Sequence, residues 1–99
     1  MKEFTYTIVD KDGMHARPAG RLAICAKQFA SNISVKANGK TADGKRLISL
    51  MMLGAVLGTT LTFSITGEDE EKAARELEQF CRTQWNSTGA VANDENLEN

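Results

Sequence analysis

The sequence predicts an α+β domain in which three helices cover one face of a four-stranded, mainly antiparallel sheet. Segments in which apolar and polar residues alternate are interspersed with segments whose apolar residues recur at helical spacing. Their order is strand, helix, strand, strand, helix, strand, helix. Strands this short cannot bury their apolar faces against one another alone, so amphipathic helices must cover the sheet. A chain of 99 residues is long enough for one such domain.

The first strand and the first helix follow directly from these two periods. The stretch "FTYTIV" (residues 4–9) predicts a strand, and "RPAGRLAICAKQFA" (residues 17–30) predicts a helix. Pro18 falls in the first helical turn, where its missing N–H breaks no helical hydrogen bond. The strand residues expected to face the core are Phe4, Tyr6 and Ile8. The helix residues expected to face it are Leu22, Cys25, Ala26 and Phe29.

A hairpin and a short helix are predicted in the middle of the chain. "NISVKA" (residues 32–37) and a partner strand over residues 40–42 flank "NGK", in which Asn and Gly tolerate the positive φ of a tight turn. "RLISLMMLG" (residues 46–54) then predicts a short helix ended by Gly54. We expect three of its residues to lie in the core: Leu50, Met52 and Leu53.

One more strand and one more helix complete the predicted domain, which spans residues 1–85. "TTLTFSITG" (residues 59–67) alternates as a strand, and residues 68–85 form a helix with acidic residues in its first turn, where the helix dipole favours them. The inward positions of the strand are Leu61, Phe63 and Ile65, and those of the helix are Ala73, Leu77, Phe80 and Cys81. Residues 86–99 are polar and aperiodic, and we expect them to form a disordered acidic tail.

Composition and charge exclude several function classes. The formal net charge is −1, which argues against a nucleic-acid-binding surface. Three of the 13 acidic side chains lie in the tail, so residues 1–85 carry 12 basic and ten acidic side chains and are slightly basic. The sequence has no apolar stretch long enough to insert into a membrane and no signal-peptide pattern, so we expect a cytoplasmic protein.

The two cysteines carry no sign of a metal or redox site. Cys25 and Cys81 lie in apolar helical patterns without Cys-x-x-Cys spacing. We expect two buried free thiols, and a disulfide between them is the alternative. The chain has one histidine, His15, and no second strong ligand is evident near it, so we expect no metal site and no cofactor.

The stretch "DGMHARPAG" (residues 12–20) carries the chemistry. A helix that begins just after His15 directs free backbone N–H groups toward the imidazole, and such a helix end binds anions. Arg17 adds a planar set of donors suited to phosphate oxygens. A neutral imidazole can attack phosphorus, so His15 and Arg17 together suggest a phosphate carrier. A surface histidine that merely starts a helix, without such chemistry, is the alternative.

Four segments resemble the HPr family, the histidine-containing phosphocarriers of the bacterial phosphoenolpyruvate:sugar phosphotransferase system. "GMHARPA" resembles the family's active-site segment, "NGK" its hairpin, "LMMLG" its second helix and "GEDEEKAAREL" the start of its last helix. The resemblance implies an open-faced β-sandwich. It also implies that Nδ1 of His15 accepts a phosphoryl group from enzyme I and passes it to the IIA domain of a sugar permease. Arg17 and the N–H groups of Ala16 and Arg17 would bind the phosphoryl oxygens.

A docking surface beside His15 is expected for such a carrier. We predict that the protein is a monomer, and that it acts as a phosphoryl carrier rather than as a stand-alone enzyme. If Leu50 and Leu53 fill the inner face of the second helix, other apolar residues remain outside for partners. The expected apolar contacts are Leu47, Ile48 and Met51. Gly20 and Gly54 would leave room for the approaching partner. The expected basic rim consists of Arg21, Lys27, Lys45 and Arg46.

The sequence departs from the family at the start of the second helix. Many family members carry there a serine that an ATP-dependent kinase phosphorylates, and this chain has Arg46 instead. Arginine has no hydroxyl to phosphorylate, and it cannot cap the helix as serine does unless Asp43 or a shifted helix start compensates. Two alternatives to the sugar phosphocarrier remain: a regulatory binding module of the same fold that transfers nothing, and a nitrogen-branch phosphocarrier, against which Pro18 argues.

Overall fold

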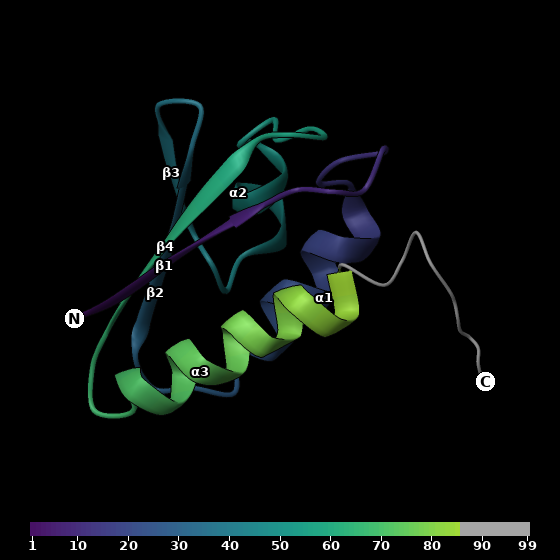
Figure 1. Cartoon of the computed structure of the whole chain (residues 1–99). Helices are drawn as coiled ribbons and strands as arrows, with labels where there is room; N and C mark the ends of the chain where they lie inside the picture. Colours follow the sequence, from purple (N-terminus) through teal and green to yellow (C-terminus); the bar gives the residue numbers. More distant parts are fainter. Residues whose placement is uncertain (86–99) are drawn as a thin grey trace.

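The computed structural model describes residues 1–85 and has the predicted α+β architecture (Figure 1). The predicted order of strands and helices is confirmed. The elements are β1 (Lys2–Thr7), α1 (Ala16–Ala26), β2 (Asn32–Ala37), β3 (Lys40–Asp43), α2 (Leu47–Met51), β4 (Thr60–Thr66), α3 (Glu70–Phe80) and η1 (Cys81–Trp85). The predicted tail, residues 86–99, lies outside the described residues.

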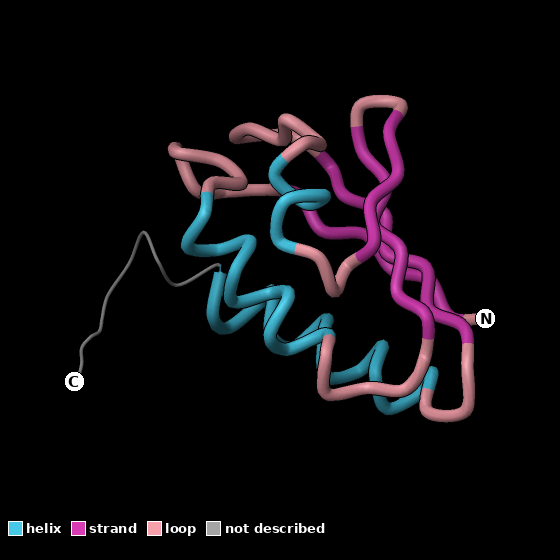
Figure 2. Tube along the Cα trace, turned by 180° about the vertical axis from the view of Figure 1, so that it is seen from behind, coloured by secondary structure: helices cyan, strands magenta, loops and turns pink. Residues whose placement is uncertain are grey.

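All four strands join one antiparallel sheet in the order β1-β4-β2-β3. The last strand of the sequence, β4, therefore lies between β1 and β2. Phe63 on β4 pairs with Phe4 on β1 and with Val35 on β2. The helices lie together on one side of the sheet, and no element of residues 1–85 covers the other side (Figures 1 and 2). This arrangement is the open-faced sandwich that the resemblance implied.

One continuous core fills the space between the sheet and the helices. The inward positions predicted for β4 are fully buried, and so are Leu22 on α1 and Leu77 on α3. The ring of Phe63 stacks on that of Phe4, with centroids 4.5 Å apart and planes inclined by 7°. Phe4 and Tyr6, predicted to face the core, pack against it but are only partly buried, because β1 is an edge strand.

Met52 corrects the predicted core, because 68% of its surface is exposed. The helix α2 has only five residues, and its inner face is set by Leu50 and by Leu53 just beyond its end, both buried. Each residue advances about 100° around a helix, so Met52, two positions after Leu50, points away from the core. The number of apolar residues in this segment therefore predicts more buried side chains than a helix of five residues can provide.

The cysteines correct the prediction in part. Both are free thiols, as expected, but only Cys81 is buried, whereas Cys25 lies at the flank of the inner face of α1 and is half-buried. Burial raises the pKa of the Cys81 thiol to about 12, which keeps it protonated. The closing helix is also less regular than predicted: α3 ends at Phe80, and the chain continues as a π-helical turn over Cys81–Trp85.

The carboxylate of Asp69 ties the start of α3 to the connection between α1 and β2. It accepts hydrogen bonds from the backbone N–H groups of Ala30 and Ser31, each at 2.9 Å, and from the Ser31 hydroxyl. Ser31 is buried, and Gly67 packs so closely on it that a Cβ there would lie 2.6 Å from Ser31 Cα. The hydrogen bond from the Ser31 hydroxyl, followed by that from Ala30, lowers the pKa of Asp69.

Asp69 is expected to make the stability of the domain sensitive to acid. A carboxyl group whose pKa is lower in the folded state stabilises it above the unfolded pKa, and this contribution is lost as the pH falls through the folded value. The unfolding free energy should therefore decrease below about pH 4, and Asp69→Asn should flatten this decrease. Urea unfolding at a series of pH values measures it. Glu68→Gln, at an exposed neighbouring position, is the control. Equal acid sensitivity in both variants would contradict the role of Asp69.

Candidate functional site

His15 lies at the surface immediately before α1 and is the N-cap residue of that helix. Its backbone is extended (φ −100°, ψ −171°), and its carbonyl accepts the N–H of Ala19, which starts the helical hydrogen bonding. Its side chain makes no capping hydrogen bond. The imidazole is therefore held at the helix end by the backbone, while its ring nitrogens stay available for chemistry.

A tight loop before His15 fixes the position of the backbone. Gly13 has φ +68° and lies against the segment after α2, so that a Cβ there would be 2.6 Å from the carbonyl oxygen of Ala55. The N–H of the buried Met14 donates to the same oxygen at 2.9 Å. A positive φ and so close a contact both require glycine. The sequence indicated only that "KDG" ends the first strand, and it did not reveal this contact.

The first turn of α1 presents unused donors beside His15. Within residues 1–85, the backbone N–H groups of Ala16 and Arg17 have no hydrogen-bond acceptor, and Pro18 has no N–H. The Arg17 side chain is exposed and makes no ion pair with another described residue. Free N–H groups at a helix start carry partial positive charge and bind anions. This arrangement suits a phosphoryl group on the imidazole.

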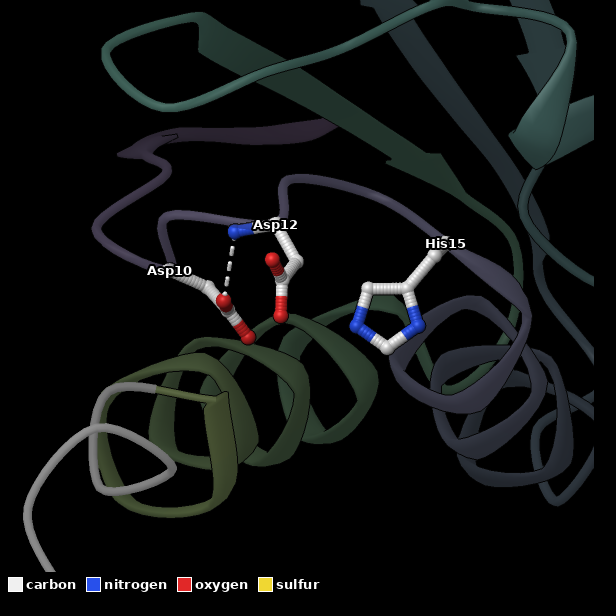
Figure 3. Close-up of side chains that lie close together, drawn as sticks. All are labelled: Asp10, Asp12 and His15. Carbon is white, nitrogen blue, oxygen red and sulfur yellow. Dashed lines mark hydrogen bonds between the residues drawn. The ribbon is translucent and has the colours of Figure 1, made fainter.

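Two aspartates approach the imidazole from the side away from α1 (Figure 3). A ring nitrogen of His15 and one carboxylate oxygen each of Asp10 and Asp12 all lie within 4.8 Å of one another. The expectation that no second strong ligand lies near His15 did not anticipate these two carboxylates, and within residues 1–85 these three side chains are grouped closely enough to hold a cation. The sequence contained a signal for this cluster, since "DKDG" forms a turn just before the helix, but its side chains could not be placed from spacing alone.

The apolar residues expected to dock partners are exposed, as predicted. Ile48 is 67% exposed, and Leu47 and Met51 are about half as exposed, while their neighbours Leu50 and Leu53 anchor α2 in the core. Helix α2 packs against α1, which carries the predicted anion site. Six further large apolar side chains of the described range are exposed and were not predicted to be: Met1, Val9, Ile24, Met52, Val56 and Leu57.

The two glycines predicted at this surface are open. A Cβ at Gly20 or Gly54 would meet no atom within 4 Å, so both leave space above the backbone. Gly54 also has φ +66°, which ends the segment of α2. The β2–β3 hairpin supports this end, because Asn38 Nδ2 donates to the carbonyl of Leu53 at 3.0 Å and Lys40 Nζ to that of Met52 at 3.3 Å.

The basic residues predicted around the surface are not equivalent. Arg21 and Lys27 are exposed on α1. Lys45, in contrast, is half-buried and its Nζ donates to the carbonyl of Phe29 at 2.7 Å. Arg46 is exposed, and its Nε lies 3.9 Å from Asp43 Oδ2. Lys45 thus braces the segment that follows α1, whereas Arg21 and Lys27 offer their charge to solvent and Arg46 is exposed but paired with Asp43.

Asp43 forms the turn before α2 but does not replace the missing cap, since it accepts N–H groups that precede the helix. The Arg46 side chain makes no capping hydrogen bond. Instead, Asp43 Oδ1 accepts the N–H of Lys45 at 2.9 Å, and the Asp43 carbonyl accepts the N–H of Arg46 at 3.1 Å. These bonds form a turn that leads into α2 without a serine or threonine cap.

In residues 1–85, no helix has the length and apolar character needed to cross a bilayer.

Comparisons with known proteins agree with this geometry. The family model described as "PTS HPr component phosphorylation site" matches residues 2–83. The phosphocarrier protein HPr of Haemophilus influenzae is 43% identical over 70 residues, which cover 71% of this chain and 82% of that protein. The crystal structure of HPr-C-His from Thermoanaerobacter tengcongensis has a TM-score of 0.81 at 34% identity, covering 88% of this chain and 98% of that one.

A second kind of relative has the same fold. The crystal structure of Crh from Bacillus subtilis, described as a catabolite repression protein, has a TM-score of 0.65 at 30% identity and covers 83% of this chain and 94% of that one. The match of the family model over almost all described residues, together with the similarity in sequence and fold, shows that this chain belongs to the HPr family of phosphocarrier proteins.

Proposed function

We propose that this protein is the phosphocarrier of a bacterial sugar phosphotransferase system. It accepts a phosphoryl group from phosphorylated enzyme I on Nδ1 of His15 and passes it to the IIA domain of a sugar permease. The observation that carries the proposal is the position of His15 at the start of α1, beside the unpaired N–H groups of Ala16 and Arg17.

The transfer chemistry follows from this position. The Nδ1 lone pair attacks phosphorus, a new N–P bond forms, and the bond from phosphorus to the donor breaks with its electron pair staying on the donor. The phosphoryl oxygens then lie against the two N–H groups and the Arg17 guanidinium. A helix dipole contributes about 0.3–1 kcal/mol to such an anion, which holds the group and still allows its release. The partners supply the rest of the catalysis.

The partner surface supports transfer to several proteins in turn. Enzyme I and the IIA domains would dock on the apolar residues Leu47, Ile48 and Met51, which lie on the helix next to α1. Methionine adapts to differently shaped partners because its side chain is flexible and polarisable. The exposed charges of Arg21, Lys27 and Arg46 would steer acidic partners toward His15.

A reconstituted phosphotransfer assay tests the proposal. The purified protein is incubated with phosphoenolpyruvate and enzyme I, and its mass is measured; a IIA domain is then added. We expect one acid-labile phosphoryl group on His15, which disappears as the IIA domain becomes phosphorylated. Absence of phosphorylation by any enzyme I would contradict the proposal.

The similarity to Crh favours one other function, a regulatory module that binds partners through the same apolar surface without phosphoryl transfer. His15 with its open donors speaks against it, and Arg46 excludes phosphorylation of a serine at that position. Tight binding to a regulatory protein together with failure in the transfer assay would support this alternative. Uptake from a nitrogen-branch enzyme I in preference to the sugar-branch enzyme would instead assign the chain to the nitrogen branch.

Ile48→Ser is expected to weaken binding to enzyme I by about five- to thirtyfold, as for a central interface residue. The side chain is largely exposed in the free protein, so its loss should leave the unfolding free energy almost unchanged. Calorimetric titration with enzyme I measures the affinity. Lys36→Ala is the control, because Lys36 is exposed on β2 between two buried residues and so points to the opposite face of the sheet. Equal effects of both substitutions would argue against docking through α2.

A further inference from the structure

The two nitrogens of the His15 ring face different surroundings (Figure 3). The nitrogen farther from the backbone, Nε2, turns toward the carboxylates of Asp10 and Asp12, and Nδ1 turns toward the opposite side. The three groups lie within 4.8 Å of one another. A negative charge near one ring nitrogen favours the proton on that nitrogen, so this asymmetry bears on which nitrogen is free to react.

The backbone holds the aspartates in this arrangement. Asp10 Oδ1 accepts the N–H of Asp12 at 2.9 Å, and the Asp10 carbonyl accepts the N–H of Gly13 at 3.0 Å. Asp10 is thereby engaged in forming the turn. The carboxylate of Asp12 is exposed and has no hydrogen bond or ion pair with another residue in the described range 1–85. Asp12 is thus the group available to interact with His15.

We propose that Asp12 is a positioning residue for His15: its carboxylate favours the tautomer that carries the proton on Nε2 and so leaves the Nδ1 lone pair free to attack phosphorus. This inference rests on the proposed phosphocarrier function and assigns a role that the Arg17 and helix-end contacts do not fill. Those contacts bind the phosphoryl group on the Nδ1 side, and Asp12 acts from the Nε2 side.

The same contact assists the transfer step itself. When Nδ1 forms its bond to phosphorus, the donor leaves with the electron pair of the broken bond, and the proton on Nε2 stays in place. The imidazole ring then carries a positive charge, shared by both nitrogens. A carboxylate facing Nε2–H stabilises this charge, as carboxylates paired with catalytic histidines do. Asp10, on the same side of the ring, adds negative charge nearby.

Nitrogen NMR tests the inference without any phosphoryl transfer. The ¹⁵N shifts of the two ring nitrogens report the tautomer ratio when the imidazole is neutral. We expect the ratio of Nε2–H to Nδ1–H in the wild type to exceed that of the same chain in denaturing urea. Asp12→Ala should reduce this tautomer ratio toward the unfolded value, and Asp12→Asn should reduce it less. Asp12→Glu keeps the carboxylate and should retain a ratio close to that of the wild type. Glu68→Gln removes a charge near the start of α3, at the opposite end of the molecule, and should have no effect (Figure 1).

The rate of phosphorylation by enzyme I provides the second measurement. An exposed charge pair of this kind corresponds to a change of about two- to fivefold in rate, so Asp12→Ala should be slower by that factor and Asp12→Glu close to the wild type. An unchanged tautomer ratio in Asp12→Ala would overturn the inference even if His15 is phosphorylated normally. A wild type that keeps the tautomer preference but takes up no phosphoryl group would instead contradict the proposed function.

Discussion

His15→Ala is expected to abolish phosphoryl uptake from enzyme I while leaving the fold intact. His15 is the only histidine of the chain, and no other described side chain combines a ring nitrogen with the open donors of the first turn of α1. The side chain lies at the surface and makes no capping hydrogen bond, so its removal should change the unfolding free energy by no more than about 0.5 kcal/mol. Mass spectrometry at alkaline pH, where phosphohistidine survives, measures the uptake.

Arg17→Ala separates the acceptor from the group that binds the phosphoryl oxygens. This variant keeps the nucleophile and the backbone N–H groups, so it should still accept a phosphoryl group, but more slowly than the wild type. Urea unfolding of His15→Ala and Arg17→Ala shows whether a lower uptake reflects changed chemistry or lost structure. Phosphorylation of His15→Ala at the wild-type rate would show that the acceptor lies elsewhere in the chain.

The fold was predictable because its signals are local and agree with one another. The alternation in "NISVKA" placed β2 at Asn32–Ala37, and the asparagine and glycine of "NGK" adopt the positive φ values that their turn requires. Pro18 lies in the first turn of α1, where it costs no hydrogen bond. The order of the sheet, with β4 beside β1, could not follow from such local signals, since it depends on which strands share the core.

The anion site was predictable from neighbouring residues for a similar reason. His15, Arg17 and the helix start are adjacent in sequence, so local geometry alone brings them together. The features that escaped prediction depend on contacts between distant segments. Gly13 packs on Ala55, and Lys45 reaches the carbonyl of Phe29. These contacts decide how rigid the loop before His15 is and which basic side chains remain free for partners.

The exposed apolar surface shows where composition misleads. Met52 was assigned to the core because it is apolar and lies in an apolar run, yet a helix of five residues buries only the side that faces the sheet. The remaining apolar residues of this segment, including Val56 and Leu57, have no core to enter. Their exposure extends the apolar surface beyond the residues expected to dock partners.

Phe63→Ala is expected to have the largest effect on stability. Phe63 lies in β4, between β1 and β2, and is fully buried. Removing a buried phenylalanine side chain costs about 3–5 kcal/mol, because the lost contacts leave a cavity that the surrounding residues fill only partly. Domains of this size have a total stability of about 5–15 kcal/mol, so the variant should unfold at a much lower urea concentration. Equilibrium unfolding followed by circular dichroism measures the shift.

Phe4 provides the matched control for this prediction. Its ring stacks on that of Phe63, but it lies on the edge strand β1 and is only partly buried. Phe4→Ala should therefore destabilise the domain less than Phe63→Ala does. Because each variant removes the same stacked pair, the double variant should cost less than the sum of the two, by about 0.5–1.5 kcal/mol. Additive effects would argue against coupling through the stacked rings, and a larger loss from Phe4→Ala would show that the core is not centred on β4.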